Sequence, residues 1–136
     1  MQRATAALAV AGALVLGGLL GSVITQAAAP KAKARKVVHV VLFKVKQDLP
    51  DGAAQRLIDD AHRLLKKIPV VRELHVGYRA PGDRPVHIRD YEVGLYILFD
   101  RLEDVQTYLD HPLHVQYARR AGEVVESVRV ADFYSD

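Results

Sequence analysis

The sequence contains no cysteine among its 136 residues. A disulfide framework, a thiolate metal site and a cysteine nucleophile are therefore excluded. The sequence also lacks a phosphate-binding loop, a glycine-rich dinucleotide motif and a serine-nucleophile motif. These absences leave no signature of nucleotide-dependent or covalent-nucleophile chemistry.

Acidic residues are absent from the first 36 positions, which hold five of the 19 lysine and arginine residues. The other 14 basic residues stand against all 16 acidic ones, so residues 37–136 carry a net charge near −2, although the whole chain carries +3 at pH 7. A mildly acidic domain is a poor electrostatic match for a phosphate backbone. We therefore expect no nucleic-acid partner.

Residues 4–29 carry no charge and contain a long apolar run that follows Arg3. A basic start, an apolar stretch and small residues for cleavage are typical of a secretory signal. We expect export to the periplasm or the extracellular space, with cleavage after Ala27 favoured over cleavage after Ala29.

The alternative is an uncleaved anchor, because the apolar run is close to the ~20 residues that span a bilayer. In that case residues 4–29 would be the only membrane contact. The basic residues at positions 31–36 would then favour a cytoplasmic location for the rest of the chain. The expected organisation is a signal peptide or anchor over 1–29, a basic linker over 30–36 and one folded domain over 37–136.

Four segments rich in apolar and β-branched residues predict strands. They are residues 37–45, 71–78, 91–99 and 128–134. The third is nearly all apolar, which predicts a central strand covered on both faces. Residues 80–90 contain two prolines and a glycine and are expected to form a loop.

Two helical regions separate these strands. Apolar positions from 54 to 68 mark one helix face, and Pro69 ends that helix. Asp100 is expected to cap a second helix together with Glu103. His111-Pro112 breaks this helix and can start another. The expected apolar stripe is Leu102, Val105 and Leu109, followed by Val115, Ala118, Ala121 and Val125.

The resulting order, β-α-β-β-α-β, is the ferredoxin-like arrangement of an α+β fold with a four-stranded antiparallel sheet. Helices can cover one sheet face only. The other face also looks apolar, because Val41 and Phe43 or their neighbours must point there. An open apolar face favours a partner, and two-fold pairing with a second copy is the simplest solution.

Several segments together resemble the stress-responsive A/B barrel (Dabb) domain. They are the strand 39–44, the strand end Val76-Gly77, the strand 91–99, the element 108–114 with the pattern Tyr-x-x-His-Pro-x-His, and the closing residues 130–134. The resemblance covers about residues 37–135. It implies a homodimer in which two sheets form a dimeric α/β barrel, and it does not imply a single function.

One plant branch of this family consists of polyketide cyclases, which close a poly-β-ketone by aldol chemistry without a cofactor. The resemblance places their functional residues at His39, Tyr108 and His114. Such a reaction needs a base near neutral pH and a donor to the developing oxyanion. We assign His114 as the base, Tyr108 as the donor and His39 as an orienting or donating partner, and we expect the three side chains to share one pocket.

Structural roles compete with these assignments. His39 is also consistent with a hydrogen-bonded core histidine, and Tyr108 with a packing residue. His111-Pro112 is expected to cap and kink the helix, and His62, His75 and His87 to lie at the surface. His111 and His114 are three residues apart, a spacing that can hold a metal, but Pro112 lies between them. No metal site and no cofactor are expected.

Three function classes remain open. The first is a homodimer that binds an unknown small molecule in the barrel interior without catalysis. The second is a cofactor-free cyclase, isomerase or lyase that uses His39, Tyr108 and His114. The third is another dimeric-barrel activity, such as an oxygenase.

Overall fold

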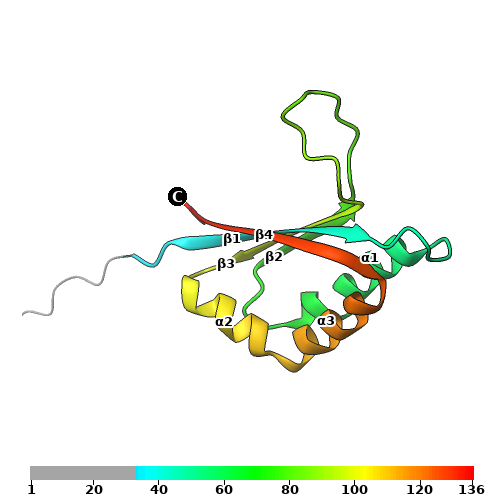
Figure 1. Cartoon of the computed structure of the whole chain (residues 1–136). Helices are drawn as coiled ribbons and strands as arrows, with labels where there is room; N and C mark the ends of the chain where they lie inside the picture. The colour runs from blue at the N-terminus through cyan, green and yellow to red at the C-terminus, as the bar shows by residue number, and fades with distance from the viewer. Residues whose placement is uncertain (1–32) are drawn as a thin grey trace, which may run out of the picture. The chain divides into compact units, whose positions relative to one another are not determined.

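The computed structural model describes residues 33–136, and the predicted export segment lies outside the described residues. The elements follow the predicted order, with one helical region divided in two (Figure 1). They are β1 (Lys36–Val45), α1 (Ala53–Leu64), the 3₁₀ turn η1 (Leu65–Lys67), β2 (Glu73–Tyr78), β3 (Val93–Phe99), α2 (Leu102–Asp110), α3 (Pro112–Val124) and β4 (Val125–Ser135). The predicted α+β, ferredoxin-like fold is confirmed.

The four strands form one antiparallel sheet in the order β2-β3-β1-β4. β1 and β3 are central, whereas β2 and β4 are the edges. All helices lie on the same side of the sheet, and the loop between β2 and β3 projects from the opposite side (Figure 1). The sheet therefore has one helix-covered face and one open face.

Side-chain alternation along β1 decides which residues face the helices. His39, Val41 and Phe43 point to the helix-covered face, where Val41 and Phe43 belong to the hydrophobic core. Val40 and Leu42 point to the open face and are half-buried. The apolar open face was predicted correctly, and it is the neighbours of Val41 and Phe43 that form it.

The open face is not covered by any helix in the part of the chain that the structure describes (Figure 1). The predicted cover on both faces of the third strand is therefore not provided by a helix within residues 33–136, although Leu98 on this face is buried. The edge strand β4 also leaves large apolar side chains in solvent. These are Val128, Val130, Phe133 and Tyr134.

The start of α2 differs from the predicted capping box. The N-cap residue is Arg101, and its side chain makes no capping hydrogen bond. Asp100 instead accepts a hydrogen bond from Nε of Arg72 at 2.6 Å. A salt bridge to the residue just before β2 thus replaces the local cap that the pattern predicted.

The buried stripe of α2 and α3 is also displaced from the predicted one. Val105 and Tyr108 are buried on α2, whereas Leu102 and Leu109 are exposed. On α3 the buried residues are Tyr117, Ala121 and Val124. Val105 and Ala121 of the predicted stripe are buried, and the aromatic residues Tyr108 and Tyr117, which the prediction left out, are buried with them.

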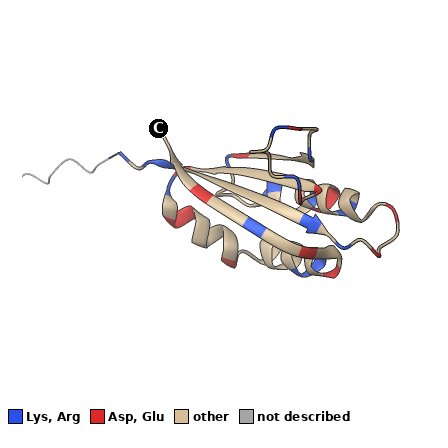
Figure 2. Ribbon diagram, turned by 45° about the horizontal axis from the view of Figure 1, so that its top comes forward, with Lys and Arg blue, Asp and Glu red and all other residues tan. Residues whose placement is uncertain are grey.

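Charges of both signs are interspersed along the described ribbon (Figure 2). On β4, for example, acidic Glu126 and Asp132 flank Arg129. Within residues 33–136, every helix is too short or too polar to cross a membrane.

Candidate functional site

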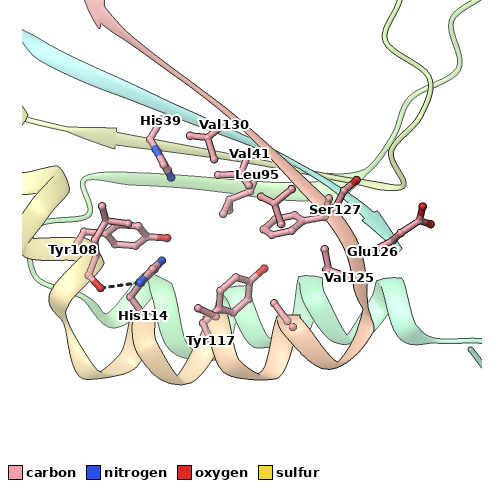
Figure 3. Close-up of a pocket in the computed structure, with 16 residues that line it drawn as sticks. His39, Val41, Leu95, Tyr108, His114, Tyr117, Val125, Glu126, Ser127 and Val130 are labelled. Atoms are coloured by element: carbon pink, nitrogen blue, oxygen red, sulfur yellow. Dashed lines mark hydrogen bonds between the residues drawn. The ribbon is translucent and has the colours of Figure 1, made fainter. Parts of the chain in front are cut away.

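A pocket of about 410 Å³ lies between the helix-covered face of the sheet and helices α2 and α3 (Figure 3). Its polar end holds His39, Tyr108 and His114, the three residues that the sequence singled out. The remaining wall is mostly apolar. It is formed by Val41, Phe43, Leu95, Leu109, Tyr117, Ala118, Ala121, Gly122, Val125, Val128 and Val130, with Glu126 and Ser127 beside Val125.

His39 reaches the pocket from the middle of β1 and is only 6% exposed. Its direct cross-strand partner on β4 is Asp132. Opposed residues on neighbouring strands place their side chains within contact distance on the same face. His39 Nδ1 accordingly lies 2.6 Å from the Asp132 carboxylate. A carboxylate oxygen accepts, so Nδ1 carries the proton and Nε2 is the nitrogen left free in neutral His39.

Tyr108 and His114 come together because the chain breaks between them. Positions six apart on a continuous helix point about 120° away from each other around the axis. Here His111 adopts an extended backbone, as expected before a proline. Its Nδ1 accepts a hydrogen bond from the Leu113 N–H at 3.1 Å and caps α3. The ring centroids of Tyr108 and His114 thereby lie 4.5 Å apart.

The hydrogen bond of His114 fixes its tautomer. Nδ1 lies 2.9 Å from the carbonyl oxygen of Leu109, which can only accept, so Nδ1 donates. Nε2 is then free to act as a base (Figure 3). Burial lowers the pKa of His114 below its usual value, and nearby His39 lowers it further, while the Leu109 carbonyl acts in the opposite direction. His114 is therefore neutral at physiological pH.

Tyr108 is 1% exposed, and its ring contacts His39 edge-on at 5.9 Å between centroids. Burial raises the pKa of its hydroxyl well above the usual value. The hydroxyl has no hydrogen-bond partner among residues 33–136, yet it is not sealed from solvent. It points along the cavity (Figure 3). Tyr108 is thus a protonated donor that is available to a ligand.

Together these groups provide a neutral base and a neutral oxygen donor at one end of an apolar cavity, next to a carboxylate-bound imidazole. That combination suits removal of a proton beside a carbonyl group. His111 serves as a helix cap, as predicted, and His62, His75 and His87 are exposed. No three His, Asp or Glu side chains within residues 33–136 are arranged to hold a metal ion.

Sequence reasoning missed the partner of one pocket residue, Asp132, which lies 2.6 Å from His39 Nδ1, and one residue of the pocket wall, Tyr117. Asp132 belongs to the closing segment that carried the family resemblance, but only the register between β1 and β4 shows that it faces His39. Tyr117 lies three residues beyond His114 on α3 and is 3% exposed. A helical spacing from His114 could have indicated it, since residues three apart share a face.

The family described as the Stress responsive A/B Barrel Domain (Dabb) matches residues 37–135. No curated protein matches the chain. A dimeric protein with a ferredoxin-like fold from Bacteroides fragilis is 31% identical, with 74% of this chain and 96% of that chain covered and a TM-score of 0.60.

Two further solved structures share the fold. A Dabb family protein from Mesorhizobium loti is 25% identical, with 75% of this chain and 98% of that chain covered and a TM-score of 0.63. A hydroxynitrile lyase from Passiflora edulis is 18% identical, with 75% of this chain and 94% of that chain covered and a TM-score of 0.64. The likeness to the lyase is one of fold alone.

Proposed function

We propose that this chain, which belongs to the stress-responsive A/B barrel domain family, binds a small carbonyl compound in the pocket of Figure 3. It would transfer a proton there without a cofactor. Solved members of the family share its helix-covered sheet. The protein would be a lyase, isomerase or cyclase. The observation that carries the proposal is the convergence of His39, Tyr108 and His114 at one end of an apolar cavity.

The proposed steps follow from the protonation state of each group. Nε2 of neutral His114 removes a proton from the carbon beside the carbonyl, and the electron pair moves onto the carbonyl oxygen. The Tyr108 hydroxyl donates a hydrogen bond to that oxygen and stabilises the enolate. The enolate then attacks a second carbonyl or takes the proton back at another atom. His39, whose Nδ1 donates to Asp132, orients the substrate through its Nε2.

Hydrogen–deuterium exchange beside the ketone of 4-phenylbutan-2-one, followed by proton NMR in deuterated buffer, tests these steps. We expect the protein to accelerate exchange over buffer. His114→Gln should reduce the rate about 100-fold or more, as expected for loss of a general base. Tyr108→Phe should reduce it by about 100- to 1,000-fold.

His62→Gln is the matched control, because His62 is an exposed histidine on α1, outside the pocket. It should leave the rate unchanged. Acceleration that survives both pocket substitutions, or no acceleration at all, would contradict the proposed chemistry.

Binding without turnover is the second candidate function, and the mostly apolar wall of the pocket favours it. Ligand-observed NMR separates the two candidates, since saturable binding of the ketone without exchange would support binding alone. An oxygenase activity stays a prediction.

We also propose that the protein is a homodimer, since solved relatives are described as dimeric.

We propose further that residues 1–29 direct the export of the protein. The export proposal depends on the sequence alone. Mass spectrometry of the secreted protein should show an N-terminus immediately after Ala27. A full-length chain retained in the membrane fraction would favour the anchor instead.

A further inference from the structure

Tyr117 is a buried tyrosine of the pocket that the proposed proton transfer does not use. It projects from α3, and its ring packs edge-on against Phe43 of β1 at 6.2 Å between centroids. Figure 3 shows its hydroxyl on the cavity side of α3, farther along the pocket than Tyr108. A phenylalanine would provide the same ring contact, so the hydroxyl needs an explanation of its own.

The hydrogen bond that this hydroxyl makes inside the protein is a poor one. It donates to the carbonyl oxygen of Leu57 over 3.4 Å, whereas bonds between two oxygen atoms are normally 2.5–3.0 Å long. Burying a hydroxyl without a good partner destabilises the fold. The hydroxyl keeps both lone pairs unused, so it can still accept a hydrogen bond from a ligand.

The surroundings make this acceptor selective. The neighbouring wall consists of Val41, Phe43, Leu95 and Ala121, which offer no hydrogen bond. Tyr108 and His114 occupy the polar end, and Glu126 and Ser127 lie at the far end (Figure 3). The Tyr117 hydroxyl therefore supplies a hydrogen-bonding group in the middle of the pocket. The two tyrosines also share one environment, because ionisation of Tyr117 would raise the pKa of Tyr108.

We propose that Tyr117 is a specificity-determining residue whose hydroxyl accepts a hydrogen bond from a ligand hydroxyl, so that the pocket selects carbonyl compounds bearing a second, distant hydroxyl group. This inference relies on the proposed function only for the placement of the carbonyl beside Tyr108 and His114. It concerns binding and does not require that the bound compound reacts.

A matched pair of ketones tests the inference. The compounds 4-(4-hydroxyphenyl)butan-2-one and 4-phenylbutan-2-one differ by one hydroxyl at the end opposite the ketone. Their dissociation constants are measured by calorimetry with the purified chain. We expect the hydroxylated ketone to bind about 2- to 10-fold more tightly, as one additional hydrogen bond allows.

Tyr117→Phe should abolish this preference and leave the affinity for 4-phenylbutan-2-one unchanged, which also demonstrates that the pocket is intact. Tyr78→Phe is the control, because the Tyr78 hydroxyl bonds to Gln55 outside the pocket. It should retain the preference. A preference that survives Tyr117→Phe, no preference in the unmodified protein, or no binding of either ketone would overturn the inference.

The outcome is separable from that of the proposed function. Selective binding without deuterium exchange would uphold the role of Tyr117 and contradict the proton transfer. Deuterium exchange without selective binding would support the proton transfer and contradict the role of Tyr117.

Discussion

Two hydrogen bonds decide which nitrogen of each pocket histidine is available for chemistry. His39 Nδ1 donates a hydrogen bond to the Asp132 carboxylate, and His114 Nδ1 donates one to the Leu109 carbonyl. Nε2 is therefore the nitrogen of each ring that these partners leave unbonded. The two partners differ in charge, since one is an ionisable carboxylate and the other a neutral carbonyl. This difference supports distinct roles for the two histidines.

The pH dependence of exchange should report the lowered pKa of His114. Catalysis needs the neutral ring, so the rate should hold as the pH falls past the ordinary value of 6.5 and decline only below it. Tyr108 on α2 and the His39–Asp132 pair of β1 and β4 are the titratable groups that face this ring. The measurement is kcat/KM for deuterium exchange against pH.

His114→Gln should remove the acidic limb of that profile together with most of the rate. At high pH no second limb should appear near the usual tyrosine range, because the raised pKa of Tyr108 keeps its hydroxyl protonated. An acidic limb above 6.5 would contradict the assignment of His114 as the base.

Asp132→Asn should lower kcat for exchange by about tenfold or more with little change in KM. The substitution removes the charge that holds the His39 ring, as the loss of an orienting carboxylate does in other acid–base sites. Asp136→Asn is the matched control, since Asp136 pairs with Arg35 at the exposed chain end. A change in KM alone would show that Asp132 serves substrate binding. An unchanged kcat and KM would show that Asp132 has no part in the reaction.

The sequence alone could identify the three pocket residues but not their partners. The family resemblance placed all three, with His39 on the first strand and Tyr108 and His114 in the Tyr-x-x-His-Pro-x-His element. Asp132 is far from His39 in sequence, and their contact depends on the register between β1 and β4. Because a slip of one residue turns every side chain to the other face, such a contact cannot be derived from composition or spacing.

At the scale of the elements, the break between α2 and α3 brings Tyr108 and His114 together. His111-Pro112 was correctly predicted as a cap and kink, because proline restricts the backbone of the preceding residue. The buried stripe was predicted in part, because Val105 and Ala121 are buried but the prediction left out Tyr108 and Tyr117. The cap at Asp100 was predicted wrongly, because a tertiary contact, the salt bridge from Arg72, engages its carboxylate.

His111→Ala should destabilise the protein by about 1 kcal/mol, since it removes the side-chain acceptor that caps α3. It should also slow exchange, because the cap orients the turn that carries His114. Chemical denaturation measures the first effect. His62→Ala provides the comparison on the exposed face of α1 and should change stability by less than about 0.5 kcal/mol. Equal stabilities of the two variants would show that the cap is not important.

At the scale of the whole molecule, the helices of residues 33–136 leave one sheet face uncovered, and the edge strand β4 exposes large apolar side chains. Phe133 is the cross-strand neighbour of Val38 and lies on the open face, 54% exposed. An apolar side chain at that position gains from burial against a second copy. The proposed pocket lies on the other face of the sheet, within one chain. The proposed self-association and the proposed ligand binding would therefore use opposite faces of the sheet.

Phe133→Asp should convert the proposed dimer into a monomer, because a second copy would have to bury an unpaired carboxylate against an apolar sheet. Sedimentation velocity gives the mass of each form. Val115→Asp is a closely matched control, since Val115 is 56% exposed but lies on α3, on the helix side of the molecule. It should remain a dimer. If both variants stay dimeric, the chains associate elsewhere than through the open face. If the unmodified protein is already a monomer, the sheet face has another partner, and the dimeric arrangement of the relatives does not extend to this chain.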